Sequence, residues 1–208
     1  MLINYYFINM FTNKEFILAS SSRSRFQILK NSGFIFKQVK PLCDEEFLKD
    51  KISIKNKTPQ NISKILSYEK SKSISKTKEH SNKLVIGCDT IVFMKKKIFN
   101  KAKNIKEAHK KILQLSGREH KIVSGITICT NGKKIWQSQE VTRVKIRKLS
   151  KKEIDNYLKS AGKQILQSAG CYQIEALGPK IIEDINGDFF NVMGLPLFKL
   201  LNFVYKIR

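Results

Sequence analysis

The stretch Leu18-Ala19-Ser20-Ser21-Ser22-Arg23-Ser24-Arg25 marks a change from strand to helix. The apolar run Phe16–Ala19 predicts a buried strand, and hydroxyl and guanidinium groups follow it where an amphipathic helix begins. The first backbone N–H groups of a helix have no partner within the helix, and the helix dipole adds positive potential there. The stretch therefore predicts an anion site, although a serine-rich helix start taken alone is more often an ordinary N-cap.

Three side chains of this stretch are candidate phosphate ligands. Ser20 and Ser22 can donate hydrogen bonds, and Arg25 offers a planar fork of N–H groups that suits phosphate oxygens.

A second turn of similar character, Gly87-Cys88-Asp89-Thr90, lies within the apolar run Leu84–Phe93. A carboxylate in such a strand is costly unless it is paired, binds a metal or takes part in chemistry. This second turn raises the weight of the phosphate-site interpretation, and it leaves three roles open for Asp89: an ion pair, a metal ligand or a part in chemistry.

Strand-like and helical runs alternate along the chain, which predicts an α/β or α+β architecture. The Lys/Ser-rich segment from about Gln60 to Thr77 has apolar residues at roughly helical spacing, and we expect an exposed helix there. Its tail, Lys72 to Asn82, is expected to be a mobile connection. Leu84–Phe93 and Ile98–Asn100 are expected to pair as a hairpin.

Two later helices have clear start signals. Asn104 is followed by Glu107, and Ser150 is followed by Glu153, each at the spacing of a capping box. A last apolar helix is expected over Pro196 to Tyr205.

Length and composition indicate a globular protein. The chain has 208 residues, of which 41% are hydrophobic and 27% charged, enough for one large domain with a proper core. The apolar stretch Leu2 to Phe11 is too short to span a bilayer and lacks the features of a signal peptide. We expect an N-terminal extension over residues 1–15 and a single domain over 16–208.

Cysteine and histidine usage argues against a zinc site or a disulfide framework. The four cysteines are widely spread and lack C-x-x-C spacing, which fits a reducing cytoplasm. Each histidine is expected to be a surface or packing residue. These residues are Cys43, Cys88, Cys129, Cys171, His80, His109 and His120.

The formal net charge of +23 and the pI near 9.9 raise the question of nucleic-acid binding. Lysine greatly outnumbers arginine, and the chain is also rich in Ile and Asn, as a compositional drift of the whole sequence would produce. No arginine-rich arm, zinc finger or aromatic-basic signature accompanies the charge. The charge is therefore compatible with any anionic ligand, including a nucleotide.

Carboxylates and lysines near predicted strand ends complete the constellation. Asp44, Glu45 and Asp89 supply the oxygen ligands that Mg²⁺ prefers when it also binds substrate phosphates. Lys70 and Lys101 could neutralise a polyphosphate while a carboxylate deprotonates the attacking water. Each lysine alone could equally be solvated.

Several motifs in chain order resemble the Maf family of nucleoside triphosphate pyrophosphatases, and the resemblance covers nearly everything from Phe16 to Leu200. The motifs are Leu18-Ala-Ser-Ser-Ser with Arg25, Asp44-Glu45, Lys70, Gly87-Cys-Asp89-Thr90, Lys101, Leu115-Ser-Gly-Arg-Glu-His120 followed by Val123-Ser-Gly125, Ala169-Gly-Cys-Tyr172, and Asn191-Val-Met-Gly-Leu-Pro-Leu197.

The resemblance implies an elongated Maf/ITPase-like α/β fold, with a mixed twisted sheet flanked by helices and a deep central cleft. It implies hydrolysis of a nucleoside triphosphate between the α and β phosphates, dependent on a divalent metal cation, Mg²⁺ or Mn²⁺, as part of house-cleaning of nucleotide pools. Asp89 resembles the family's proton acceptor, and Glu45 and Asp89 its metal-linked carboxylates. The positions that resemble its phosphate ligands are Ser20, Ser22, Arg25, Lys70 and Lys101.

The resemblance places Ser24, Thr90 and Glu175 opposite the base. Glu175 stands where the dTTP/UTP branch has Gln, and a carboxylate can accept hydrogen bonds from a guanine-like edge, as the 7-methyl-GTP branch would need. Tyr172-Gln173-Ile174 resembles the dTTP/UTP branch instead, and Ser24 matches neither. The preferred base is left open.

Two function classes follow. The first is a cytoplasmic pyrophosphatase whose partner is its nucleoside triphosphate substrate. For this class we expect no membrane binding and no stable nucleic-acid binding, and the protein could form a homodimer. The second is a non-catalytic basic protein that binds nucleic acid or a cell-division partner. The evenly spread charge and the carboxylates favour the enzyme, since carboxylates would repel a nucleic-acid backbone.

Overall fold

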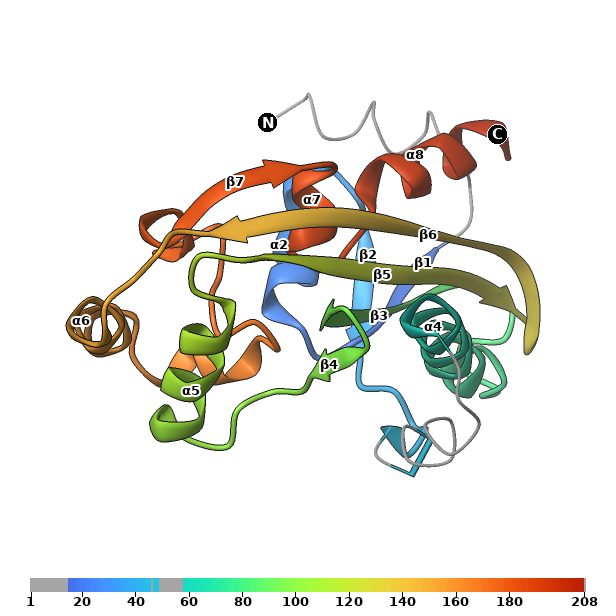
Figure 1. The fold of residues 1–208 in the computed structure, drawn as a ribbon. Coiled ribbons are helices and arrows are strands. Elements are labelled where there is room, and N and C mark those ends of the chain that lie inside the picture. Colours follow the sequence, from blue (N-terminus) through green and yellow to red (C-terminus); the bar gives the residue numbers. More distant parts are fainter. Residues whose placement is uncertain (1–14, 46, 49–57, 208) are drawn as a thin grey trace. The chain divides into compact units, whose positions relative to one another are not determined.

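The computed structural model describes residues 15–45, 47–48 and 58–207 (Figure 1). Within them the chain forms a seven-stranded mixed sheet in the order β2-β1-β3-β5-β6-β7, with β4 paired to β3. Strand β1 lies between β2 and β3 and is parallel to both, whereas β4 pairs with β3, and β7 with β6, in antiparallel fashion. The predicted mixed α/β architecture is confirmed.

The strands are β1 (Phe16–Ala19), β2 (Phe36–Val39), β3 (Leu84–Met94), β4 (Lys97–Phe99), β5 (Glu119–Thr130), β6 (Lys133–Ile146) and β7 (Ile182–Asn186). The α-helices are α2 (Arg23–Asn31), α4 (Pro59–Ser75), α5 (Ile105–Leu115), α6 (Lys151–Ala161), α7 (Phe189–Val192) and α8 (Leu197–Lys206). Two 3-10 helices are η1 (Lys163–Gln167) and η2 (Gly178–Lys180).

The described residues divide into two compact units, and β3, β5 and β6 contribute to both. The first unit comprises the described residues of Met1–Thr90, Ser124–Glu140 and Gly194–Arg208; the second comprises Ile91–Val123 and Val141–Met193. The prediction of a single domain over 16–208 stays a prediction. The predicted extension, apart from Glu15, lies outside the described residues.

In the first unit, α4 packs on the sheet through small residues. Serines recur at every fourth position of the helix and are fully buried. A Cβ added to Gly87 of β3 would lie 2.2 Å from the carbonyl oxygen of Ser67, and one added to Gly125 of β5 would lie 2.5 Å from that of Ser63. The helix backbone therefore rests directly on two strands. The buried serines are Ser63, Ser67, Ser71 and Ser75.

The expectation of an exposed helix was wrong for α4, and so was the expectation that a mobile connection begins at Lys72. The helix continues to Ser75, and hydrogen bonds satisfy its buried hydroxyls: Ser71 donates to the Val85 carbonyl at 2.6 Å, and Ser67 pairs with Thr127 at 2.8 Å. A buried hydroxyl is tolerated when it has such a partner. The polar composition of α4 therefore did not indicate that one face of the helix is buried.

The other elements of the first unit follow their sequence signals closely. Helix α2 begins at Arg23 with Ser22 as its N-cap, and α8 begins at Leu197. Trp136 of β6 stacks on Phe203 of α8 with ring centroids 4.8 Å apart.

The second unit is built around an apolar core that α5 and α6 share. The two helices lie side by side (Figure 1). Ser150 forms the full capping box with Glu153, as predicted. At α5, Asn104 caps the Glu107 N–H, but the Glu107 carboxylate accepts from the Lys103 N–H and not from that of Asn104, so only half of the predicted box forms.

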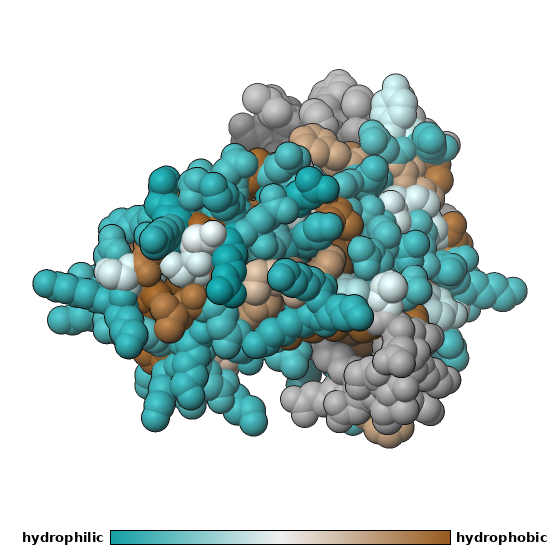
Figure 2. Space-filling model, viewed as in Figure 1, coloured by the Kyte–Doolittle hydropathy of each residue, from teal (hydrophilic) through white to brown (hydrophobic). Residues whose placement is uncertain are grey.

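The face shown in Figure 2 is mostly hydrophilic, with small separate apolar areas. Among the described residues, no helix combines the length and the apolar character that a membrane span requires.

Candidate active site

Arg25 is the centre of a polar cluster in the first unit. It lies in the first turn of α2 and is 8% exposed. Its Nε donates to the Gly194 carbonyl at 2.7 Å, its Nη1 to the Ser20 hydroxyl at 3.1 Å, and its Nη2 to the Thr90 hydroxyl at 2.9 Å. The predicted phosphate ligands Ser20 and Arg25 are therefore in direct contact.

No carboxylate pairs with this guanidinium among the residues that the structure describes. Its three partners are neutral oxygens, and two of its five N–H groups have no hydrogen-bond partner in that part of the chain. A buried charge without a counter-charge is costly. An anion that reached Arg25 would remove that cost.

The serines at the start of α2 cap the helix, and Ser20 also contacts the Arg25 side chain. Ser22 is an ordinary N-cap whose hydroxyl accepts from the Arg25 N–H at 3.4 Å. Ser20 is buried, and its hydroxyl also accepts from the Ser22 N–H at 3.2 Å. Ser24 is half-buried in the first turn. The helix start is thus capped by its own serines and still carries hydroxyl groups beside Arg25.

Lys70 bridges the two predicted metal-linked carboxylates. This α4 residue is 5% exposed, and its Nζ lies 2.6 Å from Asp89 Oδ1 and 2.8 Å from Glu45 Oε2. Burial lowers the pKa of the ammonium and Arg25 adds to that effect, but Asp89 and Glu45 outweigh both, so the pKa lies above its usual value. Lys70 is held as a cation by its two partners.

The close approach of α4 to β3 places Lys70 beside Asp89. Gly87 precedes Asp89 by two residues, so both lie on the same face of β3. Because Gly87 has no side chain, the α4 backbone around Ser67 and Ser71 can contact the strand directly. A lysine from the same turn of α4 then reaches the carboxylate.

Asp89 keeps one oxygen without a partner. The residue is 3% exposed, and its Oδ2 is buried without a hydrogen bond in the described structure, while Oδ1 holds Lys70. A buried polar atom without a partner is uncommon in native proteins and calls for an explanation. This atom can accept a proton or bind a cation.

The neighbouring Cys88 is inert in this environment. Burial raises the pKa of its thiol to about 11, against smaller opposing effects of Arg25 and Lys70. A thiol with such a pKa stays protonated at neutral pH and is a poor nucleophile.

Two further predicted residues, Lys101 and Glu175, belong to the second unit. Lys101 is exposed in the loop between β4 and α5, and Glu175 is exposed in the loop that precedes η2. Asp44 is exposed in the first unit, where its carboxylate accepts from the Phe47 N–H.

The second unit buries one pair of polar rings. His120 is 1% exposed, and its Nε2 lies 2.5 Å from the hydroxyl of Tyr172, while its Nδ1 has no partner in the described structure. Burial lowers the pKa of the imidazole to about 4, so the ring is neutral at pH 7. The expectation that His120 is a packing residue agrees with this geometry.

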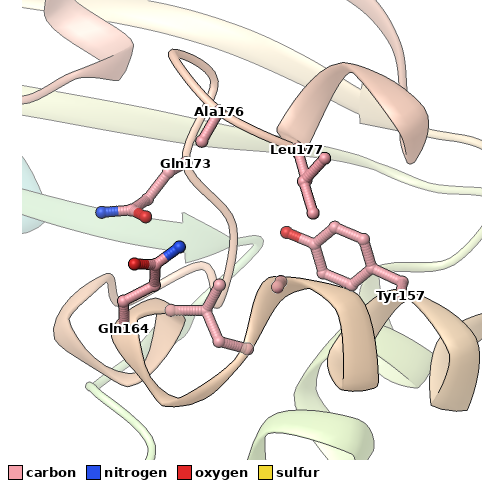
Figure 3. A pocket seen from close by; sticks show the side chains of 7 residues that line it. Tyr157, Gln164, Gln173, Ala176 and Leu177 are labelled. Carbon is pink, nitrogen blue, oxygen red and sulfur yellow. The ribbon is translucent and has the colours of Figure 1, made fainter.

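A small hollow in the same unit lies among Tyr157, Gln164, Gln173 and Leu177 (Figure 3). In this view the amides of the two glutamines point toward one another on the side away from Tyr157 and Leu177. Its volume of about 10 Å³ is about enough for one water molecule. It is too small to hold a nucleotide by itself.

Sequence reasoning missed two residues that contact Arg25 or its partner. Ser124 hydrogen bonds to the Thr90 hydroxyl at 2.9 Å, and Gly194 supplies the carbonyl that binds Arg25 Nε. Both lie in motifs that we identified, Val123-Ser-Gly125 and Asn191–Leu197, but neither motif indicates a specific contact. Only the fold brings them to α2.

Comparison with known proteins agrees with the resemblance. The family model described as Maf-like protein matches residues 15–207. The chain is 36% identical to a protein of Caulobacter vibrioides named nucleoside triphosphate pyrophosphatase, over 90% of this chain and 92% of that protein. It is 40% identical to the 7-methyl-GTP pyrophosphatase of Bartonella quintana, over 89% and 91%, and 35% identical to the dTTP/UTP pyrophosphatase of Clostridioides difficile, over 91% and 93%.

Proposed function

The chain belongs to the family of Maf-like proteins, and on this premise we propose that it is a nucleoside triphosphate pyrophosphatase. It is a hydrolase that acts on an acid anhydride, cleaving its substrate with water to a nucleoside monophosphate and pyrophosphate. The alternative of a non-catalytic basic protein is not favoured, because the relatives are named as enzymes of this kind.

One observation carries this proposal: a buried arginine without a counter-charge and a buried aspartate with an unpartnered oxygen lie in the same unit. Arg25 has only neutral partners among the described residues, and Asp89 Oδ2 has none. The positive charge of Arg25 also acts to lower the pKa of Lys70, the partner of Asp89. The charge of Arg25 is therefore felt at the ion pair that Asp89 forms. An anionic substrate would supply the counter-charge that Arg25 lacks in the described part of the chain. The unpartnered oxygen of Asp89 would be available to accept a proton.

In the reaction we assign Arg25, Ser20 and Ser22 to the polyphosphate and Asp89 to the attacking water. Asp89 accepts a proton from water as the water oxygen bonds to the α-phosphorus. The bond between that phosphorus and the oxygen bridging to the β-phosphorus breaks, and pyrophosphate leaves with the electron pair. Lys70 and Lys101 are proposed to offset the negative charge of the phosphates.

Glu45 and Asp89 fit a divalent cation. Both offer carboxylate oxygens, Asp89 Oδ2 is unpartnered, and Mg²⁺ is typically held by one or two carboxylates together with substrate phosphates. No cluster of three acidic, histidine or cysteine residues is present in the described ranges, so a site of this two-carboxylate kind depends on the substrate for further ligands. When bound, the cation would neutralise phosphate charge.

The base preference is a separate proposal. Of the three residues that the resemblance places opposite the base, we assign it to Ser24 and Glu175. The named substrates of relatives, 7-methyl-GTP and dTTP/UTP, define the panel to be tried. The setting that we propose is the cytoplasm. All four cysteines are free, as a reducing compartment favours.

The test is pyrophosphate release from a panel of canonical and modified nucleoside triphosphates with Mg²⁺ or Mn²⁺. We expect turnover of at least one substrate, and a decrease in kcat of about 10²- to 10⁴-fold in Asp89→Asn, because that variant loses its proton acceptor. Glu79→Gln is the matched control, since Glu79 is an exposed carboxylate of the same unit that pairs with Lys37 at the surface.

Two results would contradict the proposal. One is a wild-type protein that releases no pyrophosphate from any member of the panel. The other is an Asp89→Asn protein that folds and turns over as fast as the Glu79→Gln control.

A further inference from the structure

Thr90 and Ser124 form a hydrogen-bonded chain that ends on Arg25. The Thr90 hydroxyl accepts from Arg25 Nη2 at 2.9 Å and pairs with the Ser124 hydroxyl at 2.9 Å. Ser124 is fully buried on β5, whereas Thr90 is half-buried on β3. Two neighbouring strands therefore supply one acceptor for one nitrogen of the guanidinium.

Gly194 supplies a second acceptor on the same side of the guanidinium as Thr90, whose hydroxyl lies 3.4 Å from the Gly194 carbonyl. Its carbonyl accepts from Arg25 Nε at 2.7 Å, and its φ of +101° lies in a region that L side chains rarely adopt. A Cβ at this position would lie 3.1 Å from Thr90 Oγ1 and 3.4 Å from Arg25 Nε. A glycine here lets the backbone reach both groups.

These contacts fix the plane of the guanidinium. Acceptors from Ser20 directly after β1, from β3 and from the turn before α8 hold one N–H on each of its three nitrogens. A planar fork held at three points cannot rotate about its long side chain, so its remaining two N–H groups keep one orientation. Preorganised donors bind an anion better than mobile ones, because less conformational entropy is lost on binding.

We propose that Thr90, Ser124 and Gly194 are positioning residues that orient Arg25 toward the polyphosphate, and that Thr90 acts through Arg25 and not on the base. The proposal rests on the proposed function, since it takes Arg25 as a phosphate ligand. It changes the expected consequence of altering Thr90: binding of every triphosphate is weakened to the same extent, whatever the base.

Inorganic tripolyphosphate is the probe that separates the two roles, because it has no base. We measure its Kd by calorimetry, together with kcat and KM for dTTP and 7-methyl-GTP. In Thr90→Val we expect about a tenfold increase in the Kd of tripolyphosphate, corresponding to loss of one charge-assisted contact. KM for both nucleotides should rise by the same factor, leaving the ratio of their kcat/KM values unchanged.

Three further variants make the test specific. Thr90→Ser keeps the hydroxyl and should restore wild-type affinity, whereas Ser124→Ala should weaken tripolyphosphate binding less than Thr90→Val does. Thr127→Val is the matched control, because Thr127 is buried on β5 in the same unit and its hydroxyl pairs with Ser67 and Gln137 instead. It should leave tripolyphosphate affinity unchanged.

An unchanged tripolyphosphate affinity in Thr90→Val, with a shifted preference between the two nucleotides, would overturn the proposal and assign Thr90 to the base. Equal weakening by Thr90→Ser and Thr90→Val would also overturn it, since the hydroxyl would then be irrelevant. Failure of the proposed function is seen separately, as a wild-type protein that cleaves no nucleotide.

Discussion

Two buried polar clusters, one in each unit, differ in whether they carry charge. In the first, the ammonium of Lys70 is buried as a cation between the carboxylates of Asp89 and Glu45. In the second, the imidazole of His120 is buried beside the hydroxyl of Tyr172, and burial lowers its pKa to about 4. One site keeps its charges by pairing them, whereas the other avoids charge.

This difference helps to distinguish polar groups that serve the reaction from polar groups that serve packing. A buried ion pair is costly to assemble and is often no more stabilising than apolar residues of similar size. A neutral hydrogen-bonded pair has a smaller desolvation cost. We infer that the charges around Lys70 are present for the reaction, while His120 and Tyr172 serve the core of their unit.

The largest expected effect follows from removing the cation of the charged site. In Lys70→Met, Asp89 and Glu45 lose the partner that they share, and the free energy of unfolding should fall by about 4 kcal/mol at neutral pH. Protonation of one carboxylate relieves the loss, so the deficit should narrow as the pH is lowered. Urea denaturation of the variant and the wild type across a pH series measures both effects.

Lys37→Met is the control for this substitution. It makes the same change in an exposed pair, where the Lys37 and Glu79 side chains are 64% and 65% exposed. Exposed ion pairs contribute little to stability, so this variant should resemble the wild type. A similar small effect of both variants would show that the Lys70 cluster is not buried in solution.

The next effect comes from the neutral site. His120 has a folded pKa of about 4, below its ordinary value of 6.5, so the unfolded chain binds the proton at a higher pH than the folded chain does. Stability is therefore unaffected above pH 6.5 and falls as the pH decreases toward 4. The loss amounts to about 3 kcal/mol, and His120→Gln should remove it.

The measurement is the free energy of unfolding between pH 4 and 7 for both proteins. His109→Gln removes an imidazole from the same unit but leaves His120 in place, so it should keep the slope of the wild type. An unaltered slope in His120→Gln would mean that this ring is hydrated and titrates normally.

Much of the charged site could be predicted from the sequence. Asp89 is recognisable because a carboxylate inside the apolar strand Leu84–Met94 needs a reason to be there. Arg25 and Ser20 are recognisable because they stand at a strand-to-helix junction. These signals are local, and the strand and helix that carry them formed as expected.

The contacts between distant segments could not be predicted. That Lys70 is shared by two carboxylates, or that Gly194 binds Arg25, depends on how α4 and the turn before α8 reach the sheet. The serine-rich composition of α4 predicted an exposed helix, but its serines are buried where the helix packs against Gly87 and Gly125. Periodicity shows which residues share a helix face. It does not show that glycines on neighbouring strands let that face pack against the sheet.

The smallest predicted effect tests the hydrogen bond of the neutral pair itself. Tyr172→Phe removes the hydroxyl that lies 2.5 Å from His120 Nε2 and leaves that nitrogen without this partner in a buried site, which should cost about 1 kcal/mol of unfolding free energy. Tyr157→Phe makes the same change in the same unit, but the Tyr157 hydroxyl reaches the Cys171 carbonyl only at 3.5 Å, so it should cost less. Pyrophosphate release should be unaffected by Tyr172→Phe, because His120 is assigned to the core. A loss of turnover without a loss of stability would break the division between the two sites, since the neutral pair would then take part in the reaction.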